Sequence, residues 1–234
     1  MAERPYTLLS CSMSIDGYLD SAEGERLILS NEADLDRVDE VRAGCDAILV
    51  GATTVRKDNP RLLVRRAERR EERVARGLKP SPVKVTVTCR SDLDPAARFF
   101  ATGESEKLVY CPAASITAAR SRLGAVATVV DGGERVSMRA LSEDLADRGV
   151  GRLMVEGGGT IHTQFLADDL ADELQLVVAP FFVGDSRARR LVDDGRFPAR
   201  PGHPATLVDV RRIGEVVLLR YALSPRFEDS GEVS

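Results

Sequence analysis

The sequence predicts an α/β fold with a largely parallel β-sheet, and three observations support this prediction. Short apolar runs alternate with helical stretches, and each connection is long enough to return the chain for a parallel strand. A strand-like run over 152–155 leads through Glu156 and three glycines into a helix. Late in the chain, two strand-like runs meet at Gly214 and predict an antiparallel hairpin, so the sheet should be mixed.

The first half of the chain should supply three strands and two helices. Each strand is predicted from an apolar, β-prone run. The Ser-Asn pair at 30–31 can cap the longer helix, which ends at Gly44. A short helix capped by Thr53 or Thr54 must stop before Pro60. The three strand-like runs are 6–13, 46–50 and 83–88.

Residues 65–79 differ from these elements, because both charge signs are dense there and almost no apolar face remains. This composition is typical of a solvated helix or an excursion from the core. The balance of acidic and basic residues argues against a nucleic-acid-binding arm.

The second half should continue the alternation before the sheet becomes antiparallel. Ser137 can cap a helix that Gly149 stops. The long loop at 185–204 is rich in Arg, Asp, Gly and Pro and is a candidate lid or dimer contact. The expected strands are 107–111, 127–131, 152–155, 173–183, 206–213 and 215–223, and the expected helices are 115–123, 137–148 and 161–170.

Length and composition favour one enzyme-sized domain. With 234 residues and 43% hydrophobic content, we expect a single domain over 1–227 and a disordered acidic tail over 228–234. A net charge of -4 with interspersed signs provides no basic field for nucleic acid, and no apolar run approaches the length of a membrane span. The first residues lack the apolar core of a signal peptide, so we expect a cytoplasmic protein.

The cysteines and histidines do not form a recognisable metal motif. The cysteines are scattered, mostly within apolar runs, and are expected to be reduced core residues. With only two histidines, a histidine-rich metal centre is not expected, and His162 is predicted to lie on a helix surface. The cysteines are Cys11, Cys45, Cys89 and Cys111.

Glu156 and the glycines that follow it form the main candidate site. Gly157, Gly158 and Gly159 can adopt backbone angles closed to other residues, and they let a ligand approach the main-chain amides. The order strand, Glu, glycines, helix favours a nucleotide or dinucleotide site, because the N-terminus of a helix attracts phosphate. Glycine triplets also make plain turns, and the usual spaced glycine fingerprint is not present.

Several segments occur together in an order that is more specific than any one of them. The segments are Ser14-Ile-Asp-Gly17, Val41 to Gly51, Thr54 to Leu62, Val155 to Thr160, and Ala171 to Leu174 with Ala179-Pro180. As a set, they resemble the riboflavin-pathway pyrimidine reductases. The resemblance implies a dihydrofolate-reductase-like three-layer sandwich with a mixed, mostly parallel sheet, a C-terminal antiparallel hairpin and a homodimeric state.

In this family, the ribosylamino group of a 5-phosphoribosylamino pyrimidine is reduced to a ribitylamino group, with NADPH as the hydride donor. The resemblance therefore implies an NADPH-dependent oxidoreductase that acts on either the 2,5-diamino pyrimidine or its deaminated 5-amino uracil counterpart. Nothing in the chain resembles the zinc site of the deaminase found in bifunctional members, so a stand-alone reductase is expected.

The resemblance also implies which residues contact the substrate. Arg42 and Arg65 are expected to bind its phosphate, Leu62 to line the pocket and Glu156 to contact the sugar as a catalytic acid or base. Asp16, in the polar turn after the first strand, is a further predicted substrate contact.

A second set is expected to bind NADPH. Arg90 and Ser91 are the candidates for the 2′-phosphate, and the glycine amides suit the pyrophosphate. The predicted cofactor residues are Thr54, Asp58, Cys89, Arg90, Ser91, Gly157, Gly158, Gly159 and Thr160.

Two other functions remain open from the sequence. One is a reductase of a pterin or another heterocycle, and the other is a nucleotide-binding relative without catalytic activity. Tyr18 favours the second, because family members often carry Lys or Arg directly after the Asp-Gly turn. Glu25 and Leu27 also differ from the Ser and Trp of bacterial bifunctional members.

Overall fold

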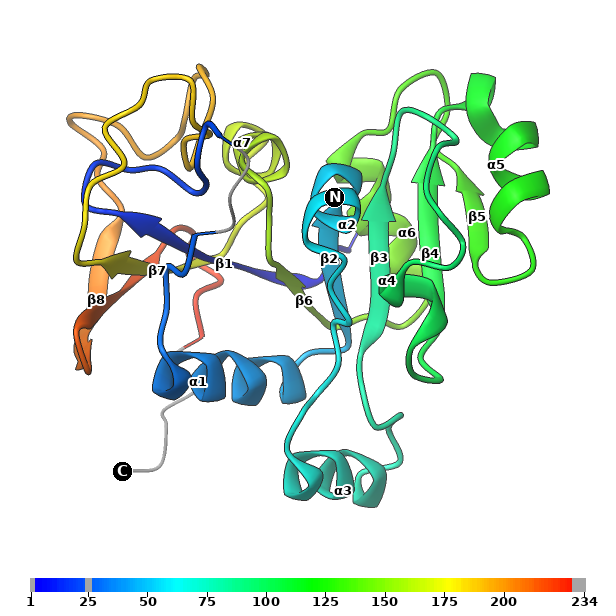
Figure 1. Cartoon of the computed structure of the whole chain (residues 1–234), viewed down its shortest axis with the longest axis horizontal. Helices are drawn as coiled ribbons and strands as arrows, with labels where there is room; N and C mark the ends of the chain where they lie inside the picture. Colours follow the sequence, from blue (N-terminus) through cyan, green and yellow to red (C-terminus); the bar gives the residue numbers. More distant parts are fainter. Residues whose placement is uncertain (1–2, 24–26, 229–234) are drawn as a thin grey trace.

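The strands found in residues 3–23 and 27–228, which the computed structural model describes, form one nine-stranded sheet (Figure 1). Its strand order is β5-β4-β3-β2-β6-β1-β7-β9-β8. The strands are β1 (Tyr6–Ser14), β2 (Ala47–Gly51), β3 (Val83–Val87), β4 (Lys107–Cys111), β5 (Thr128–Asp131), β6 (Arg152–Val155), β7 (Glu173–Ala179), β8 (Thr206–Ile213) and β9 (Val216–Ala222). The helices are α1 (Glu32–Ala43), α2 (Ala52–Asp58), α3 (Ala67–Ala75), α4 (Arg98–Ala101), α5 (Ile116–Leu123), α6 (Met138–Asp147) and α7 (Gly159–Ala167), with a 3₁₀ turn η1 (Ala113–Ser115).

The predicted mixed sheet is confirmed. Strands β1 to β7 pair in parallel, whereas β9 pairs antiparallel with both β7 and β8. The hairpin turns at Gly214, whose φ of 61° suits a residue without a side chain. Long crossovers therefore build the parallel part, and one tight turn builds its antiparallel edge.

Helices cover both faces of the sheet, which gives the predicted three-layer sandwich. Leu8 and Ile48 point into a core with α1, α2, α4 and α5, whereas their neighbours Leu9 and Leu49 point into a second core with α6 and α7. Each of these four side chains has no exposed surface. Strands buried on both faces explain why the sequence shows continuous apolar runs rather than strict alternation.

Several element boundaries differ from the predictions. The strand expected over 173–183 ends at Ala179, because Pro180 has no amide hydrogen to continue the ladder. Helix α2 is preceded by Gly51 rather than by a capping threonine. Helix α7 begins at Gly159, two residues before the predicted start at 161, and the short helix α4 was not predicted. By contrast, Asn31 caps α1 as expected, with its side chain accepting from the amide of Asp34.

Two predictions about individual side chains were wrong. Cys89 is exposed rather than part of the core, because it follows β3 instead of lying within it. His162 is fully buried rather than on a helix surface, because α7 turns this side of the helix toward the protein interior. All four cysteines are free thiols.

The described residues contain no helix that is both long and apolar enough to cross a membrane. The single-domain boundary at 227 stays a prediction. Residues 229–234 of the predicted acidic tail, and Glu25, lie outside the described residues.

Candidate active site

The candidate site begins where β6 ends. The Glu156 amide donates to the Leu49 carbonyl of β2, which keeps the residue aligned with the sheet edge. Its carboxylate receives two hydrogen bonds from Arg42, one from Nε and one from Nη2, each 2.6 Å long. Both side chains are mostly buried, with 18% of Arg42 and 14% of Glu156 exposed. The pair joins the last turn of α1 to the carboxyl end of a central strand.

This pairing governs the charge of Arg42. Burial alone would lower the pKa of the guanidinium, but the attraction and hydrogen bonds of Glu156 outweigh it and raise the pKa. A bidentate contact of this geometry also fixes the plane of both groups. Arg42 is therefore held as a permanent cation, and Glu156 has one side-chain partner that a ligand can replace.

Arg65 lies in the segment before α3, and its side chain contacts residues of α1. Its guanidinium donates to the Leu35 carbonyl, and its Nε lies 3.6 Å from a carboxylate oxygen of Asp39. About half of the side chain, 52%, is exposed. Arg42 thus belongs to α1 and Arg65 contacts α1 from the segment before α3, and their guanidinium groups have different partners.

Asp39 and Leu62 fix the position of the chain segment that leads to Arg65. The Asp39 carboxylate accepts the amides of Arg65 and Arg66 and holds this segment against α1. Burial would raise the Asp39 pKa, but these hydrogen bonds outweigh it and lower the pKa. Leu62 is 2% exposed and has a positive φ of 48°, so its side chain belongs to the core on the α1 side of the sheet.

The predicted glycine turn follows Glu156 directly. Gly157 has a φ of 113°, which side chains rarely tolerate, and its carbonyl accepts the Gly51 amide at 2.8 Å. The Gly157-Gly158 peptide is cis. A Cβ on Gly159 would lie 2.6 Å from the Arg190 carbonyl oxygen, so this position excludes any larger residue. Helix α7 then begins at Gly159 without a side-chain cap.

The predicted cofactor residues follow three adjacent parallel strands, β3, β2 and β6. A Cβ on Gly158 would lie 3.6 Å from Thr54 Oγ1, an ordinary van der Waals distance, so α2 packs close to the glycine turn. Asp58 is exposed at the end of α2. Because carboxyl ends of parallel strands meet at one edge, residues far apart in sequence come together here.

The turn after β3 belongs to the same edge. Cys89 and Arg90 are exposed and Ser91 is partly buried. The turn is ordered by the Thr88 hydroxyl, which accepts the Arg90 amide at 3.1 Å. An ion pair of 2.9 Å between Arg56 and Asp92 joins this turn to α2.

Asp16, the further predicted substrate contact, is held by hydrogen bonds within the protein, and its role toward a substrate stays a prediction. Its carboxylate accepts hydrogen bonds from the Ser14 hydroxyl and from the amides of Val183 and Gly184, at 2.5, 3.0 and 2.8 Å. Burial raises the Asp16 pKa, but these bonds outweigh it and lower the pKa to about 2. Asp16 joins the turn after β1 to the loop after β7.

That loop covers the start of α7, an arrangement that the sequence did not indicate. The Thr160 hydroxyl donates to Asp193 Oδ2 at 3.1 Å, and the Asp193 amide donates to the Thr163 hydroxyl at 2.8 Å. Loop residue Arg190 forms a β-bridge with Tyr18, and its guanidinium lies over the tyrosine ring. The candidate lid of the sequence prediction therefore packs on the glycine turn.

Beneath the turn, His162 is buried with no hydrogen-bond partner for either ring nitrogen among the described residues. Its Nε2 would lie 3.4 Å from a Cβ on Gly157. Burial lowers the His162 pKa to about 4. A neutral imidazole thus packs under the peptide that follows Glu156.

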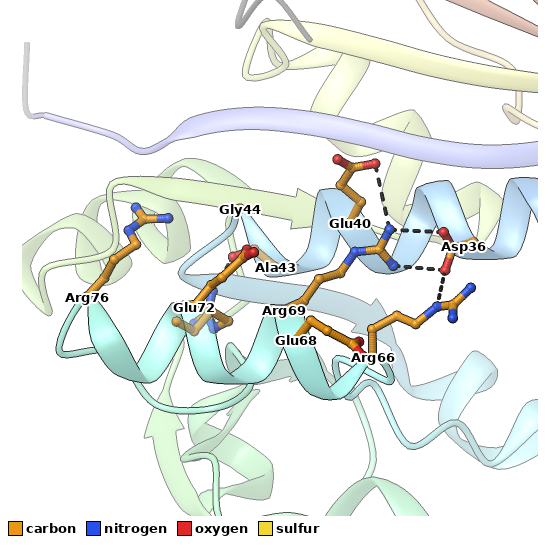
Figure 2. Close-up of a pocket in the computed structure, with 10 residues that line it drawn as sticks. Asp36, Glu40, Ala43, Gly44, Arg66, Glu68, Arg69, Glu72 and Arg76 are labelled. Atoms are coloured by element: carbon orange, nitrogen blue, oxygen red, sulfur yellow. Dashed lines mark hydrogen bonds and ion pairs between the residues drawn. The ribbon is translucent and has the colours of Figure 1, made fainter. Parts of the chain in front are cut away.

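A separate cavity of about 530 Å³ lies between α1 and α3 and contains none of the predicted site residues (Figure 2). Four acidic and four basic side chains line it, and several pair with one another: Arg69 contacts Asp36 and Glu40, and Arg66 contacts Asp36. Because the charges balance, the cavity has no preference for an anionic ligand. The chemistry of the site lies at the strand ends instead.

Comparison with known proteins identifies relatives of the whole chain. A sequence model of the RibD C-terminal domain matches residues 5–219. The 2,5-diamino-6-ribosylamino-4(3H)-pyrimidinone 5′-phosphate reductase of Archaeoglobus fulgidus is 36% identical over 228 residues, which cover 96% of this chain and 99% of the relative.

Solved structures agree on the fold. A pyrimidine reductase-like protein of Corynebacterium diphtheriae superimposes with a TM-score of 0.79 at 20% identity, covering 93% of this chain and 91% of the other. The chain covers only 58% of the longer RibD of Acinetobacter baumannii (94% of this chain; TM-score 0.76, 24% identity). Dihydrofolate reductase of Enterococcus faecalis gives a TM-score of 0.51 at 12% identity, with 93% and 95% coverage, so the predicted dihydrofolate-reductase-like fold is confirmed.

Proposed function

The chain belongs to the RibD C-terminal domain family, and we propose that it is the riboflavin-pathway reductase that converts a 5-phosphoribosylamino pyrimidine to the ribitylamino form with NADPH. The 2,5-diamino pyrimidinone phosphate is the first substrate to test, because the Archaeoglobus relative carries that name over nearly its whole length. The deaminated 5-amino uracil is the alternative substrate.

The bidentate pair of Glu156 and Arg42 beside the glycine turn is the observation on which this proposal rests. Opening of the ribose ring and reduction of the resulting imine require one proton and one hydride. NADPH supplies the hydride. Glu156 is suited to hold the proton near the sugar, since its carboxylate is mostly buried and has one exchangeable partner. Arg42 orients that carboxylate and, when released, offers a planar fork to a phosphate.

The residues around the glycine turn fit a dinucleotide. The start of α7 has no side-chain cap and offers amides to a pyrophosphate, and Thr54 Oγ1 lies close to Gly158 in the same turn region. Asp58, Cys89 and Ser91 stand at the ends of the neighbouring elements and would contact the ribose and its phosphate.

A turnover assay tests the proposal. The purified chain is given NADPH and each pyrimidine phosphate in turn, and loss of NADPH absorbance is followed together with product mass. Oxidation coupled to a ribitylamino product is the expected result. Dihydrofolate serves as the comparison substrate, and activity on dihydrofolate alone would refute the proposal.

Arg90 is proposed to select NADPH over NADH, because its exposed guanidinium stands on an ordered turn after β3. Arg90→Ala should raise the KM for NADPH by about tenfold, which corresponds to one charge-assisted contact, and leave the KM for NADH nearly unchanged. An equal rise in the KM for NADPH and for NADH would show that Arg90 does not select between the two cofactors.

A homodimer and a cytoplasmic location complete the proposal and follow from the family resemblance and the sequence. Light scattering after size-exclusion chromatography tests the first. A mass of one chain, 25.4 kDa, at micromolar concentration would contradict it.

A further inference from the structure

The turn after β1 and the loop after β7 are joined into one unit at the start of α7. The Leu19 amide donates to the Arg189 carbonyl at 2.7 Å, and the Leu191 amide donates to the Gly17 carbonyl at 3.2 Å. These bonds bracket the β-bridge between Tyr18 and Arg190. The position of Arg190 is therefore determined by backbone pairing on both sides.

The Arg190 side chain is also held in place. Its guanidinium carbon lies 5.2 Å from the centre of the Tyr18 ring, and Nη2 donates to the Tyr18 hydroxyl at 3.3 Å. Tyr18 is only 5% exposed, so the ring is a fixed platform, whereas Arg190 is exposed. The Arg190 carbonyl lies against Gly159, at the first residue of α7. The Arg190 backbone therefore packs against the start of α7, and its guanidinium is held on the Tyr18 ring.

Arg190 differs from Arg42, Arg65 and Arg187 in having no carboxylate partner among the described residues. Arg42 is paired with Glu156, Arg65 lies near Asp39, and Arg187 in the same loop pairs with Asp185 at 2.7 Å. Within the part of the chain that the structure describes, no ion pair forms at Arg190. Its positive charge is available to a ligand without the breaking of an internal contact.

We propose that Arg190 binds a phosphate group of a ligand in this site, with Tyr18 as the residue that positions it. This inference rests on the proposed function. The ligand phosphate can come from the pyrimidine substrate or from NADPH, and the chemistry of recognition is the same: a planar fork matches phosphate oxygens, and the start of α7 adds partial positive charge.

Arg190→Ala tests the inference against Arg189→Ala, a matched control. Arg189 is adjacent and exposed, and its side chain forms no hydrogen bond or ion pair with the described residues. Arg190→Ala should raise the KM for either the phosphorylated pyrimidine or NADPH by at least tenfold, with kcat changed less than threefold. Which KM rises identifies the source of the phosphate. Arg189→Ala should stay within twofold of the wild type.

Two further measurements keep the test independent of the proposed activity. Calorimetric titration with inorganic phosphate and fluorescence titration with NADPH should show weaker binding of at least one of them to Arg190→Ala. Tyr18→Ala should reproduce that loss in part, and Arg190→Lys should restore it in part. If both KM values and both binding constants stay within twofold of Arg189→Ala, Arg190 is not a phosphate-binding residue. Failure of the wild type to oxidise NADPH with any pyrimidine would refute the proposed function, while the titrations would still decide the role of Arg190.

Discussion

Two glutamates, one partly exposed and one fully buried, lie at opposite ends of the parallel strands and show how the same residue type serves different purposes. Glu156 follows the carboxyl end of β6, is 14% exposed and has one arginine as its side-chain partner. Glu173 begins β7, has no exposed surface and accepts hydrogen bonds from Tyr6, Gln175 and Arg220 at 3.0, 2.8 and 3.0 Å. Arg152 lies 3.7 Å from it as well.

The number of partners separates the two roles. The Glu173 carboxylate is surrounded by donors from β1, β6, β7 and β9, so no position is left for a ligand. A ligand that binds Glu156 has to replace the bidentate contact with Arg42, and the exposed 14% of the Glu156 side chain is where the ligand can reach it. A fully partnered buried carboxylate stabilises the fold, and a partly exposed one with a single partner is available for chemistry.

The largest expected effect is on stability, from Glu173→Leu. The substitution removes the Glu173 carboxylate from buried Arg220 and Tyr6, so the free energy of unfolding should fall by about 3–5 kcal/mol. Denaturant unfolding followed by circular dichroism measures it. Glu173→Gln, which keeps one acceptor oxygen, is the matched control and should cost less. A loss below about 1 kcal/mol for the leucine variant would contradict the structural role.

Glu156→Gln should show the opposite pattern. Loss of the proton-holding carboxylate should lower kcat by about 100-fold, while the unfolding free energy changes less than in Glu173→Leu. Steady-state turnover with NADPH across pH, together with thermal melting, measures both. Glu40→Gln on the exposed side of α1 is the control, since that carboxylate is 62% exposed. Wild-type turnover at every pH would exclude a proton relay through Glu156.

Tyr6→Phe removes one of the hydrogen bonds to Glu173 and leaves the rest of the network in place. Burial and the Glu173 charge raise the Tyr6 pKa, so the hydroxyl stays protonated and donates. We expect a loss of about 1.5–3 kcal/mol in the unfolding free energy and unchanged kcat. Tyr221→Phe is the comparison, because its hydroxyl has no hydrogen bond to the described residues. An equal free energy of unfolding for Tyr6→Phe and Tyr221→Phe would show that the hydrogen bond from Tyr6 to Glu173 does not stabilise the fold.

His162 extends the comparison to a buried imidazole whose ring nitrogens form no hydrogen bond of normal geometry with the described residues. Burial holds its pKa at about 4 in the folded protein, below the ordinary 6.5, so the unfolded chain binds more protons between these values. The stabilisation from this group is therefore present above pH 6.5 and is lost as the pH falls toward 4. Between pH 7 and pH 5, the free energy of unfolding should fall by about 2 kcal/mol because of His162.

His162→Phe should remove this pH dependence, as measured by unfolding free energies at pH 7, 6 and 5. His203→Asn, on an exposed residue, should keep it. Aspartates such as Asp16 and Asp185, with pKa values of about 2, titrate below this window and do not obscure it. The same slope in wild type and His162→Phe would show that the histidine does not control acid stability.

Local sequence was sufficient for most elements. Strands β4 and β8 have the predicted bounds, and Asn31 and Ser137 cap α1 and α6 as expected. These features depend on side-chain periodicity and on hydrogen bonds within three or four residues. The turn from Glu156 to Gly159 was also predicted, because consecutive glycines directly after an apolar strand-like run indicate a turn.

Other features required the folded chain. Nothing near His162 in sequence indicates that its side of α7 faces the interior, and the isolated strand-like run at 173–183 does not reveal where pairing ends. The hydrogen bonds that Asp16 accepts from the Val183 and Gly184 amides come from a loop more than 160 residues away, and nothing near Asp16 in sequence indicates them.

The amino-acid sequence alone predicted most of the strands and helices and the glycine turn, since these arise from interactions between near neighbours, and the order of these elements along the chain predicted the mixed sheet. The resemblance to a family added Arg42 and Glu156 as residues of one site. Only the tertiary structure decided that these two side chains pair across 114 positions, that Glu173 is fully partnered, and that Arg190 lies over Tyr18 across 172 positions. Such contacts depend on which strands become neighbours in the sheet, and strand order follows from the packing of the whole chain.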